Sequence, residues 1–273
     1  MRIRRVWAVY FSPTGNTKAL TCAAAQEVAA HLQAAYQEID LTRPAAREAV
    51  YNFAADDFVL VGSPTYAGKL PNKILPYFQA GLRGLDTPAI ALVSFGNRSY
   101  DNALAELCAT LEQGGFRVLA GGAFVGRHAF SDQLASGRPD AADLQQLRNF
   151  AAKTTEKWTK THGNCAKIQP KGDANALYYV PKGEDGQPAK FLKAKPRTRA
   201  EVCTACGLCA AACPMGSIDR ENPAQVSGIC IKCQSCVRNC PHGAKYFDDP
   251  AFLSHVRMLE QHFTRRAENE MFW

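Results

Sequence analysis

Long apolar runs are missing from this sequence of 273 residues. The run nearest the N-terminus, residues 6–11, is followed by Ser12-Pro13 and is too short for the core of a signal peptide or for a membrane span. The GxGxxG motif is also absent, so the sequence gives no support for direct use of NAD(P)H through a dinucleotide-binding loop. We therefore expect a cytoplasmic protein without a membrane span.

Cysteine is scarce over most of the chain and dense in one part of it. Eight of the 11 cysteines lie between Cys203 and Cys240. In a reducing cytosol, such density is more typical of metal ligands than of disulfides. Of the other three, Cys22 and Cys108 fall in predicted helices, where buried small side chains are expected, and Cys165 is expected to be a structural or exposed thiol.

Composition and charge indicate a globular protein of more than one domain. Hydrophobic residues make up 47% of the chain and charged residues 21%, which is enough apolar material for a sizeable core. At roughly 150 residues per domain, the length suggests two domains. The formal net charge is +7, but residues 166–199 alone contain eight Lys/Arg and three Asp/Glu. Because the excess is concentrated in one connecting segment, the charge does not by itself predict nucleic-acid binding.

Residues 1–160, predicted as one domain, alternate short apolar strands with helices. This alternation predicts an α/β fold, a doubly wound parallel sheet of five strands with helices on both faces. The predicted strands are 6–11, 36–39, 58–62, 89–94 and 118–124, and the predicted helices are 17–32, 72–79, 102–113 and 141–158, with a weaker helical signal at 43–51.

Three further segments follow residues 1–160. Residues 161–198 form a basic linker, in which 177–180 and 189–192 are predicted to pair as a hairpin. Residues 199–249 contain the dense cysteines. Residues 250–273 are predicted to form a C-terminal helix and tail, because Phe252, Val256, Leu259 and Phe263 recur at helical spacing.

The dense cysteines form an internal repeat of period 27, and each copy reads Cys-x-x-Cys-x-x-Cys-x-x-x-Cys-Pro. Three thiolates at this spacing can hold one face of a cubane iron-sulfur cluster, while the fourth is directed towards a second cluster. Zinc is the alternative, but a zinc ribbon needs only two Cys-x-x-Cys pairs and leaves the third cysteine and the Cys-Pro of each copy without a role. The two copies contain Cys203, Cys206, Cys209 and Cys213, and Cys230, Cys233, Cys236 and Cys240.

With these two runs, residues 199–247 resemble the bacterial two-[4Fe-4S] ferredoxins, whose motif both copies match in full. The resemblance implies a small α+β domain whose clusters pass single electrons. It also implies one cluster on Cys203, Cys206, Cys209 and Cys240, and another on Cys230, Cys233, Cys236 and Cys213.

A loop rich in hydroxyl groups follows the first predicted strand and precedes a helix. Hydroxyls and backbone N–H groups at a helix N-terminus can bind a phosphate group without lysine or arginine. The spacing is neither GxxxxGK[ST] nor GxGxxG, so the loop is not typical of ATP or NAD sites. An ordinary helix cap is the alternative to a phosphate site. The candidate phosphate residues are Ser12, Thr14, Gly15, Asn16 and Thr17.

Two more loops follow predicted strands at the edge where open parallel sheets bind ligands. They run over residues 62–71 and 94–101, and each contains glycine and one tyrosine. Together with the hydroxyl-rich loop they resemble the flavodoxin family over residues 4–158, which implies strand order 2-1-3-4-5 and bound FMN. By motif position, Tyr66 and Tyr100 are implied to stack on the flavin ring, although core or surface tyrosines remain the alternative. The other implied contacts are Pro64, Thr65, Ala67, Gly68, Ser94, Phe95, Gly96, Asn97 and Asp101.

One position departs from the flavodoxin pattern. Ala67 stands where many flavodoxins have a glycine, and the glycine comes one place later, at Gly68. A peptide flip that requires positive φ costs alanine more, so strong stabilisation of the neutral flavin semiquinone is not expected. Arg98, Arg127 and His128 are further candidates near the ligand, with a structural or solvated side chain as the alternative for each.

Taken together, the two parts resemble the flavodoxin-ferredoxin fusion proteins of anaerobic microbes. Three functions stay open. The first is single-electron transfer between two [4Fe-4S] clusters and FMN, to or from a redox partner such as a ferredoxin. The second is reduction of a small-molecule substrate by an FMN-dependent iron-sulfur oxidoreductase. The third is a redox-responsive binding module whose basic linker contacts nucleic acid or an acidic protein. The sequence identifies no catalytic residue.

Overall fold

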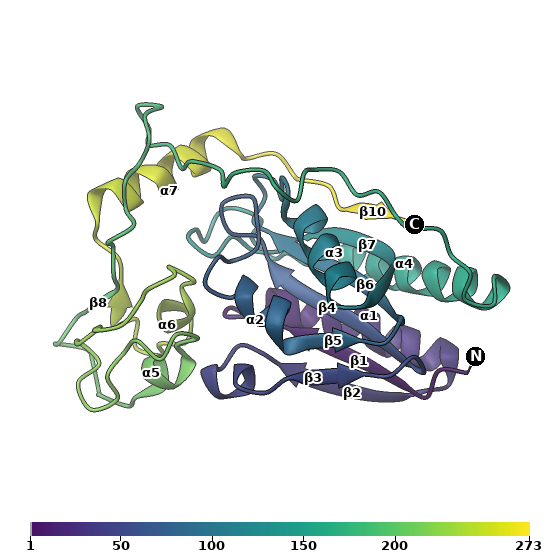
Figure 1. Ribbon diagram of the computed structural model, residues 1–273. Helices are drawn as coiled ribbons and strands as arrows, with labels where there is room; N and C mark the ends of the chain where they lie inside the picture. Colours follow the sequence, from purple (N-terminus) through teal and green to yellow (C-terminus); the bar gives the residue numbers. More distant parts are fainter. Residues whose placement is uncertain (1) are drawn as a thin grey trace.

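A parallel sheet dominates the computed structural model, which describes residues 2–273 (Figure 1). The strand order is β10-β7-β6-β4-β1-β2, and only β10 runs antiparallel to its neighbour. Without β10, the five parallel strands numbered along the chain lie in the order 2-1-3-4-5. The bounds are Arg5–Tyr10 for β1, Ala35–Asp40 for β2, Asp57–Pro64 for β4, Thr87–Phe95 for β6, Phe116–Val125 for β7 and Glu270–Phe272 for β10.

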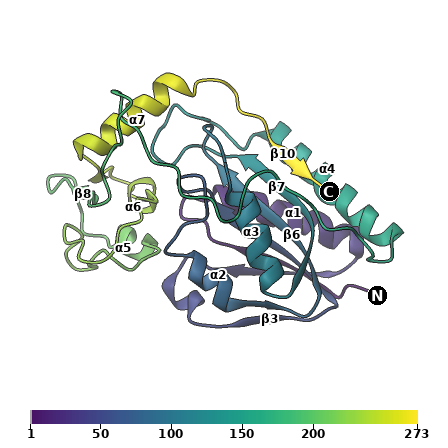
Figure 2. The same cartoon turned by 45° about the horizontal axis from the view of Figure 1, so that its top comes forward.

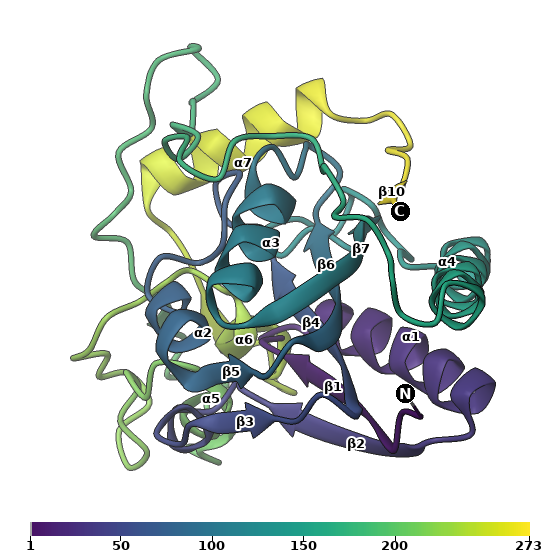
Figure 3. The same ribbon diagram turned by 45° about the vertical axis from the view of Figure 1, so that its right-hand side comes forward.

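Helices cover both faces of this sheet, as Figure 3 shows. Helices α1 (Asn16–Leu32) and α4 (Ala141–Lys160) pack together on one face, while α2 (Leu75–Gly81) and α3 (Ala103–Gln113) lie on the other. Every residue of the central strand β6 is buried, as expected for a strand enclosed from both sides. The short strands β3 (Tyr51–Phe53) and β5 (Leu82–Gly84) form a separate parallel pair.

The structure corrects three expectations about secondary structure. The sheet has six strands rather than five, because the predicted C-terminal tail supplies β10 at the β7 edge. The weak helical signal at 43–51 yields only the 3₁₀ turn η1 (Pro44–Arg47), followed by β3. The predicted linker hairpin is reduced to a turn with one bridge, Lys182 to Pro188. Its first strand is lost because the Tyr179 N–H bonds instead to the Ala67 carbonyl of the sheet domain.

The cysteine repeat is visible in the backbone. Two short helices, α5 (Leu208–Ala212) and α6 (Ser235–Arg238), begin at equivalent positions of the two copies, and β8 (Arg197–Thr198) pairs with β9 (Lys245–Tyr246). Positive φ angles also recur at equivalent positions of both copies. These pairs are Ala205 with Lys232, Gly207 with Gln234, and Gly216 with Gly243. The two copies therefore share one conformation as well as one motif.

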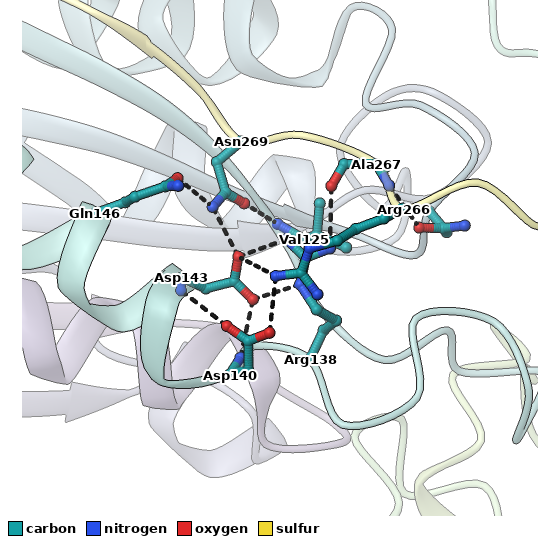
Figure 4. A network of polar contacts seen from close by, with 9 residues as sticks. Val125, Arg138, Asp140, Asp143, Gln146, Arg266, Ala267 and Asn269 are labelled. Atoms are coloured by element: carbon teal, nitrogen blue, oxygen red, sulfur yellow. Dashed lines mark hydrogen bonds and ion pairs between the residues drawn. The ribbon is translucent and has the colours of Figure 1, made fainter.

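The C-terminal segment leads from the cysteine-rich part back to the sheet. In Figures 1 and 2, the chain passes from α5 and α6 through α7 (Pro250–His262) to β10. A polar network around the buried ion pair of Arg138 and Asp143 fastens this segment (Figure 4). Asn269 donates to Asp143 at 2.9 Å and accepts from the Val125 N–H at 2.9 Å. The C-terminal segment is thus tied to the sheet by side chains as well as by strand pairing.

Within residues 2–273, no helix combines the length and the apolar character that a membrane crossing requires.

Candidate functional site

The eight cysteines of the repeat gather around two separate small cavities. One cavity is lined by Cys203, Cys206, Cys209 and Cys240, and we call these four the outer group because Cys206 is exposed. The other is lined by Cys213, Cys230, Cys233 and Cys236, which we call the inner group. In each group three thiols come from one copy of the repeat and the fourth comes from the other copy.

Burial and backbone N–H groups give the cysteines surroundings that suit metal-bound thiolates. Burial raises the pKa of Cys236 to about 12, so a free thiol there keeps its proton. In each copy, the fourth cysteine accepts a backbone N–H from the residue four places later, Ser217 to Cys213 at 3.4 Å and Ala244 to Cys240 at 3.2 Å. Such N–H bonds stabilise thiolate ligands, and iron supplies the positive charge that buried thiolates need. The donor set therefore fits iron-sulfur clusters.

Two arginines dock the cysteine-rich part on the sheet domain. Arg238 donates to the carbonyl oxygens of Ala129 and Ser131, each at 3.1 Å, in the loop after β7. The buried Arg47 donates to the carbonyls of Leu41 at 2.7 Å and Thr42 at 2.9 Å. Arg47 also bonds the Pro214 carbonyl beside the inner group. These contacts hold the inner group against the sheet domain.

A cavity of about 620 Å³ lies at the interface of the two parts. This is a volume typical of small-molecule sites, which span about 300–1,000 Å³. Eleven of the sixteen flavin candidates line it: Thr14, Asn16, Thr17, Pro64, Thr65, Tyr66, Ala67, Gly68, Ser94, Phe95 and Gly96. Ile229, Cys230 and Ile231 line both this cavity and the cavity of the inner cysteine group.

The hydroxyl-rich loop presents the start of α1 to this cavity. Gly15 caps the helix with φ of 92° and has no side chain that could bond the first turn. Thr14 lines the cavity, and within residues 2–273 its hydroxyl makes no hydrogen bond. The Thr17 hydroxyl is bonded to Ser94 at 2.7 Å, and Ser12, which does not line the cavity, accepts from the Lys18 N–H at 2.9 Å. Thr14 is therefore the hydroxyl most available to a phosphate group.

The loop after β4 forms a tight turn at the cavity. Tyr66 and Lys69 exchange two backbone hydrogen bonds, and the two central residues, Ala67 and Gly68, have φ of 47° and 77°. Both angles are in the left-handed region that glycine tolerates and alanine disfavours. Burial and the nearby thiols of Cys233 and Cys230 raise the pKa of Tyr66 well above its usual range. Tyr66 thus lies between the sheet domain and the inner cysteine group.

The neighbouring Thr65 supports a bound ligand. Thr65 lines the cavity, and its buried hydroxyl oxygen has no hydrogen-bond partner in the described part of the chain. An unpaired buried hydroxyl costs about 1–3 kcal/mol, which a polar ligand atom would offset. With the unpaired Thr14 hydroxyl and the start of α1, this arrangement fits a phosphate-bearing cofactor such as FMN.

In the loop after β6, the three flavin candidates Asn97, Tyr100 and Asp101 do not line the cavity and have partners within the protein. Tyr100 is buried in the core and donates to Glu270 at 3.0 Å. Asn97 donates to the carbonyl of Phe263 at 2.6 Å, so it holds the segment after α7. Asp101 pairs with Arg98. For Asn97 and Tyr100 the sequence could not show these contacts, since their partners are far away in the chain, whereas Arg98 is only three residues from Asp101.

The linker covers the cavity, which the sequence did not predict. Tyr178 and Tyr179 line it, and the Tyr178 hydroxyl donates to the Leu70 carbonyl at 2.8 Å. The buried Lys69 donates to the carbonyls of Ala174 and Ala176, both at 2.8 Å, and pairs with Glu106 at 2.9 Å. The two adjacent tyrosines in the basic linker were the sequence signal that could have predicted this cover.

Two histidines line the cavity, one in the loop after β7 and one on α7. His128 was a candidate from the sequence, whereas His255 on α7 was not. Burial, together with the nearby charges of His255, Arg238 and Arg98, lowers the pKa of His128 to about 4. Burial also lowers the pKa of His255. His128 packs so closely on Gly96 that a side-chain carbon there would lie 2.4 Å from the imidazole ring.

The low pKa of His128 predicts a pH dependence of stability. The unfolded chain binds a proton at this histidine below about pH 6.5, whereas the folded chain does so only near pH 4. The unfolding free energy should therefore fall as the pH drops through this window, by at most about 1.4 kcal/mol per pH unit from this group. Urea unfolding at several pH values measures it. His128→Gln should flatten the dependence and His31→Gln, at an exposed site, should not; equal slopes for all three proteins would contradict the prediction.

Comparison with solved structures finds α/β proteins that match the sheet domain only weakly. A flavodoxin from the domain Archaea is 17% identical over 57% of this chain and 99% of its own, with a TM-score of 0.37. The Flv1 flavodiiron core from Synechocystis sp. PCC6803 is 17% identical over 59% of this chain and 37% of its own, with a TM-score of 0.40. A flavone reductase is 11% identical over 63% and 68%, with a TM-score of 0.40. At this level the neighbours do not indicate what this chain binds.

Sequence comparison is informative for the cysteine-rich part alone. No curated protein matches the chain. Residues 202–245 match the family described as the 4Fe-4S dicluster domain, and this range contains all eight cysteines of the repeat. The segment therefore carries two [4Fe-4S] clusters.

Proposed function

We propose that this protein transfers single electrons between two [4Fe-4S] clusters and an FMN bound in the 620 Å³ cavity. The observation that carries the proposal is that Cys230 lines both this cavity and the cavity of the inner cysteine group. A cluster held by the inner group would then adjoin the flavin. Flavins accept electrons singly and release one or two, so they can join a one-electron chain to a second reaction.

The ligand sets follow the two cysteine groups. We assign one cluster to the outer group and the other to the inner group, and the FMN phosphate to Thr14 and the first turn of α1. Electrons would then pass between the solvent side and the flavin through the outer cluster and the inner cluster in turn. The exposed Val202 and Leu208 flank the exposed Cys206 and offer a docking surface to a redox partner protein such as a ferredoxin.

A second function, reduction of a small molecule at the flavin, is favoured by the enclosure of the cavity. The linker and α7 add Tyr179, Phe191 and His255 to its walls, so bound flavin would be covered on the side away from the sheet. A protein that only exchanges electrons with large partners has no need for such a covered space. Both functions use the same clusters and the same flavin site. We also propose that the protein is cytoplasmic, because cysteines stay reduced there before cluster assembly.

Thr14→Val tests the flavin site. Loss of a charge-assisted hydrogen bond to phosphate, worth about 1.5–3 kcal/mol, should weaken FMN binding by roughly ten- to hundredfold. Thr154→Val is the matched control, because its hydroxyl bonds only within α4. Flavin fluorescence gives the affinity, and iron and sulfide analysis should show unchanged clusters. Unaltered FMN affinity in Thr14→Val would refute the phosphate assignment, and stoichiometric zinc without sulfide would refute the clusters.

A further inference from the structure

Part of the cavity wall comes from outside the flavin loops, and we call this part the second end. Its walls come from the loop after β7, from the linker and from α7, and they include Phe130, Phe191 and Leu259 beside the two histidines. Phe191 stacks on the His255 ring with centroids 5.4 Å apart, and the His128 and Phe130 centroids are 5.3 Å apart. This end is therefore apolar and aromatic apart from the imidazole nitrogens and the charged groups at its margin.

The hydrogen bonds fix which nitrogen of His128 carries the proton. Nδ1 of His128 accepts the Phe130 backbone N–H at 3.1 Å, so Nδ1 carries no proton. The neutral ring must then hold its proton on Nε2. Within residues 2–273 that Nε2–H has no hydrogen-bond acceptor, and the side chain lines the cavity. His128 thus presents an unused donor.

His255 has the opposite tautomer. Its Nδ1 lies 2.8 Å from the carbonyl oxygen of Lys182, and because a carbonyl only accepts, Nδ1 must carry the proton. In the neutral ring Nε2 is then a bare acceptor, and it too lacks a partner among the described residues. One cavity end therefore offers one donor and one acceptor, both on rigidly packed rings.

The arginines near the histidines already have acidic partners. Arg98 is paired with Asp101, while Arg238 and Arg127 share Asp132. The Arg98 guanidinium also stacks on the Tyr179 ring, 3.9 Å from its centroid. The ligand chemistry at this end is therefore set by the Nε2 atoms of the two neutral histidines, of which one is a donor and the other an acceptor.

We propose that His128 and His255 form a binding subsite for a small, flat organic molecule that carries a carbonyl oxygen and a separate hydroxyl or N–H group. The carbonyl oxygen accepts from Nε2–H of His128, and the hydroxyl or N–H donates to Nε2 of His255. The ring of the molecule packs among Phe130, Phe191 and Tyr179. This subsite goes beyond the proposed electron transfer and names the class of small molecule that would meet the flavin.

The test combines three probes with two variants of the holoprotein. 4-Hydroxyacetophenone carries both groups, acetophenone lacks the hydroxyl, and phenol lacks the carbonyl. His128→Phe removes the donor and His255→Phe removes the acceptor, while each keeps a flat ring, and His31→Phe is a surface control. Binding is measured by NMR of the ¹⁵N-labelled histidines and, where flavin is bound, by its absorbance.

Each variant should weaken the binding of 4-hydroxyacetophenone by about tenfold, because one lost hydrogen bond costs about 1.4 kcal/mol of binding free energy. The affinity for acetophenone should fall only in His128→Phe, and the affinity for phenol should fall only in His255→Phe. Failure of all three probes to bind the wild-type protein, or equal affinity in wild type and variants, overturns the subsite. Loss of FMN in either variant also overturns it, because the histidines would then be flavin contacts. Electron transfer from clusters to flavin is measured in the same proteins and scored separately, so failure of the proposed electron transfer is distinguished from failure of the subsite.

Discussion

Removing the inner cluster should slow reduction of the flavin by a one-electron donor roughly a hundredfold. A cluster tethered in the same chain acts at an effective concentration in the millimolar range, whereas a free donor in such an assay is present at about 10 µM. Cys230→Ala removes the inner cysteine that lines the flavin cavity, and Cys22→Ala is the control outside the repeat. Anaerobic stopped-flow absorbance follows the clusters and the flavin separately, and cluster bleaching should precede flavin bleaching in the wild type.

A second variant tests electron transfer from the clusters to the flavin without changing any cysteine. Arg238→Gln removes the donor that holds the loop carbonyls of Ala129 and Ser131, so the inner group should move relative to the flavin cavity. Iron content should stay at wild-type level while flavin bleaching slows. Arg220→Gln, an exposed change in the same part of the chain, should alter neither. Flavin reduced at the wild-type rate in protein that lacks both clusters would disprove the route and favour a flavoenzyme with structural clusters.

The parts of the fold that follow local rules were predictable from the sequence. The alternation of apolar strands and helices located β1, β4, β6 and β7, which are mostly buried runs, and also the edge strand β2, of which only Ile39 is buried. The cysteine spacing predicted two copies of one unit. The structure adds that they share left-handed residues at equivalent positions, such as Gly216 and Gly243, which the spacing did not predict.

What depended on contacts between distant segments was not predictable. Strand β10 forms because Glu270–Phe272 reaches the exposed edge of β7, and nothing in so short a segment announces that pairing. The linker hairpin failed for the same reason, since the Tyr179 N–H found the Ala67 carbonyl as a partner.

The residues of the candidate site also fall into a set that the sequence predicted and a set that it did not. The residues of the flavin loops that line the cavity were predicted by their position after strands, at the edge where parallel sheets bind ligands. The burial of Tyr100 away from the cavity and the presence of His255 in its wall were not predicted, and both have the same cause. Tyr100 bonds Glu270, 170 residues away, and His255 enters the cavity from a helix beyond the cysteine repeat.

The second large effect is expected at the buried ion pair under the linker. Lys69 and Glu106 are 6% and 7% exposed, with Nζ and Oε1 2.9 Å apart. Lys69→Met should leave the Glu106 carboxylate buried without a cation and lower the free energy of unfolding by about 3–5 kcal/mol. Lys18→Met is the control, because Lys18 is half-exposed, 3.9 Å from Glu38, and such surface pairs contribute about 0–1 kcal/mol. Urea unfolding measures both.

The same change should loosen the cover of the cavity. Lys69 also donates to the carbonyls of Ala174 and Ala176, which lie shortly before the tyrosines that line the cavity, so its loss frees this part of the linker. FMN should dissociate faster from Lys69→Met than from Lys18→Met. In the double variant Lys69→Met/Glu106→Leu much of the stability should return, although not all, because the Leu70 N–H loses Glu106 as its acceptor at 2.7 Å. If Lys69→Met costs no more than Lys18→Met, the pair neither stabilises the fold nor holds the linker, and some other contact keeps the cavity closed.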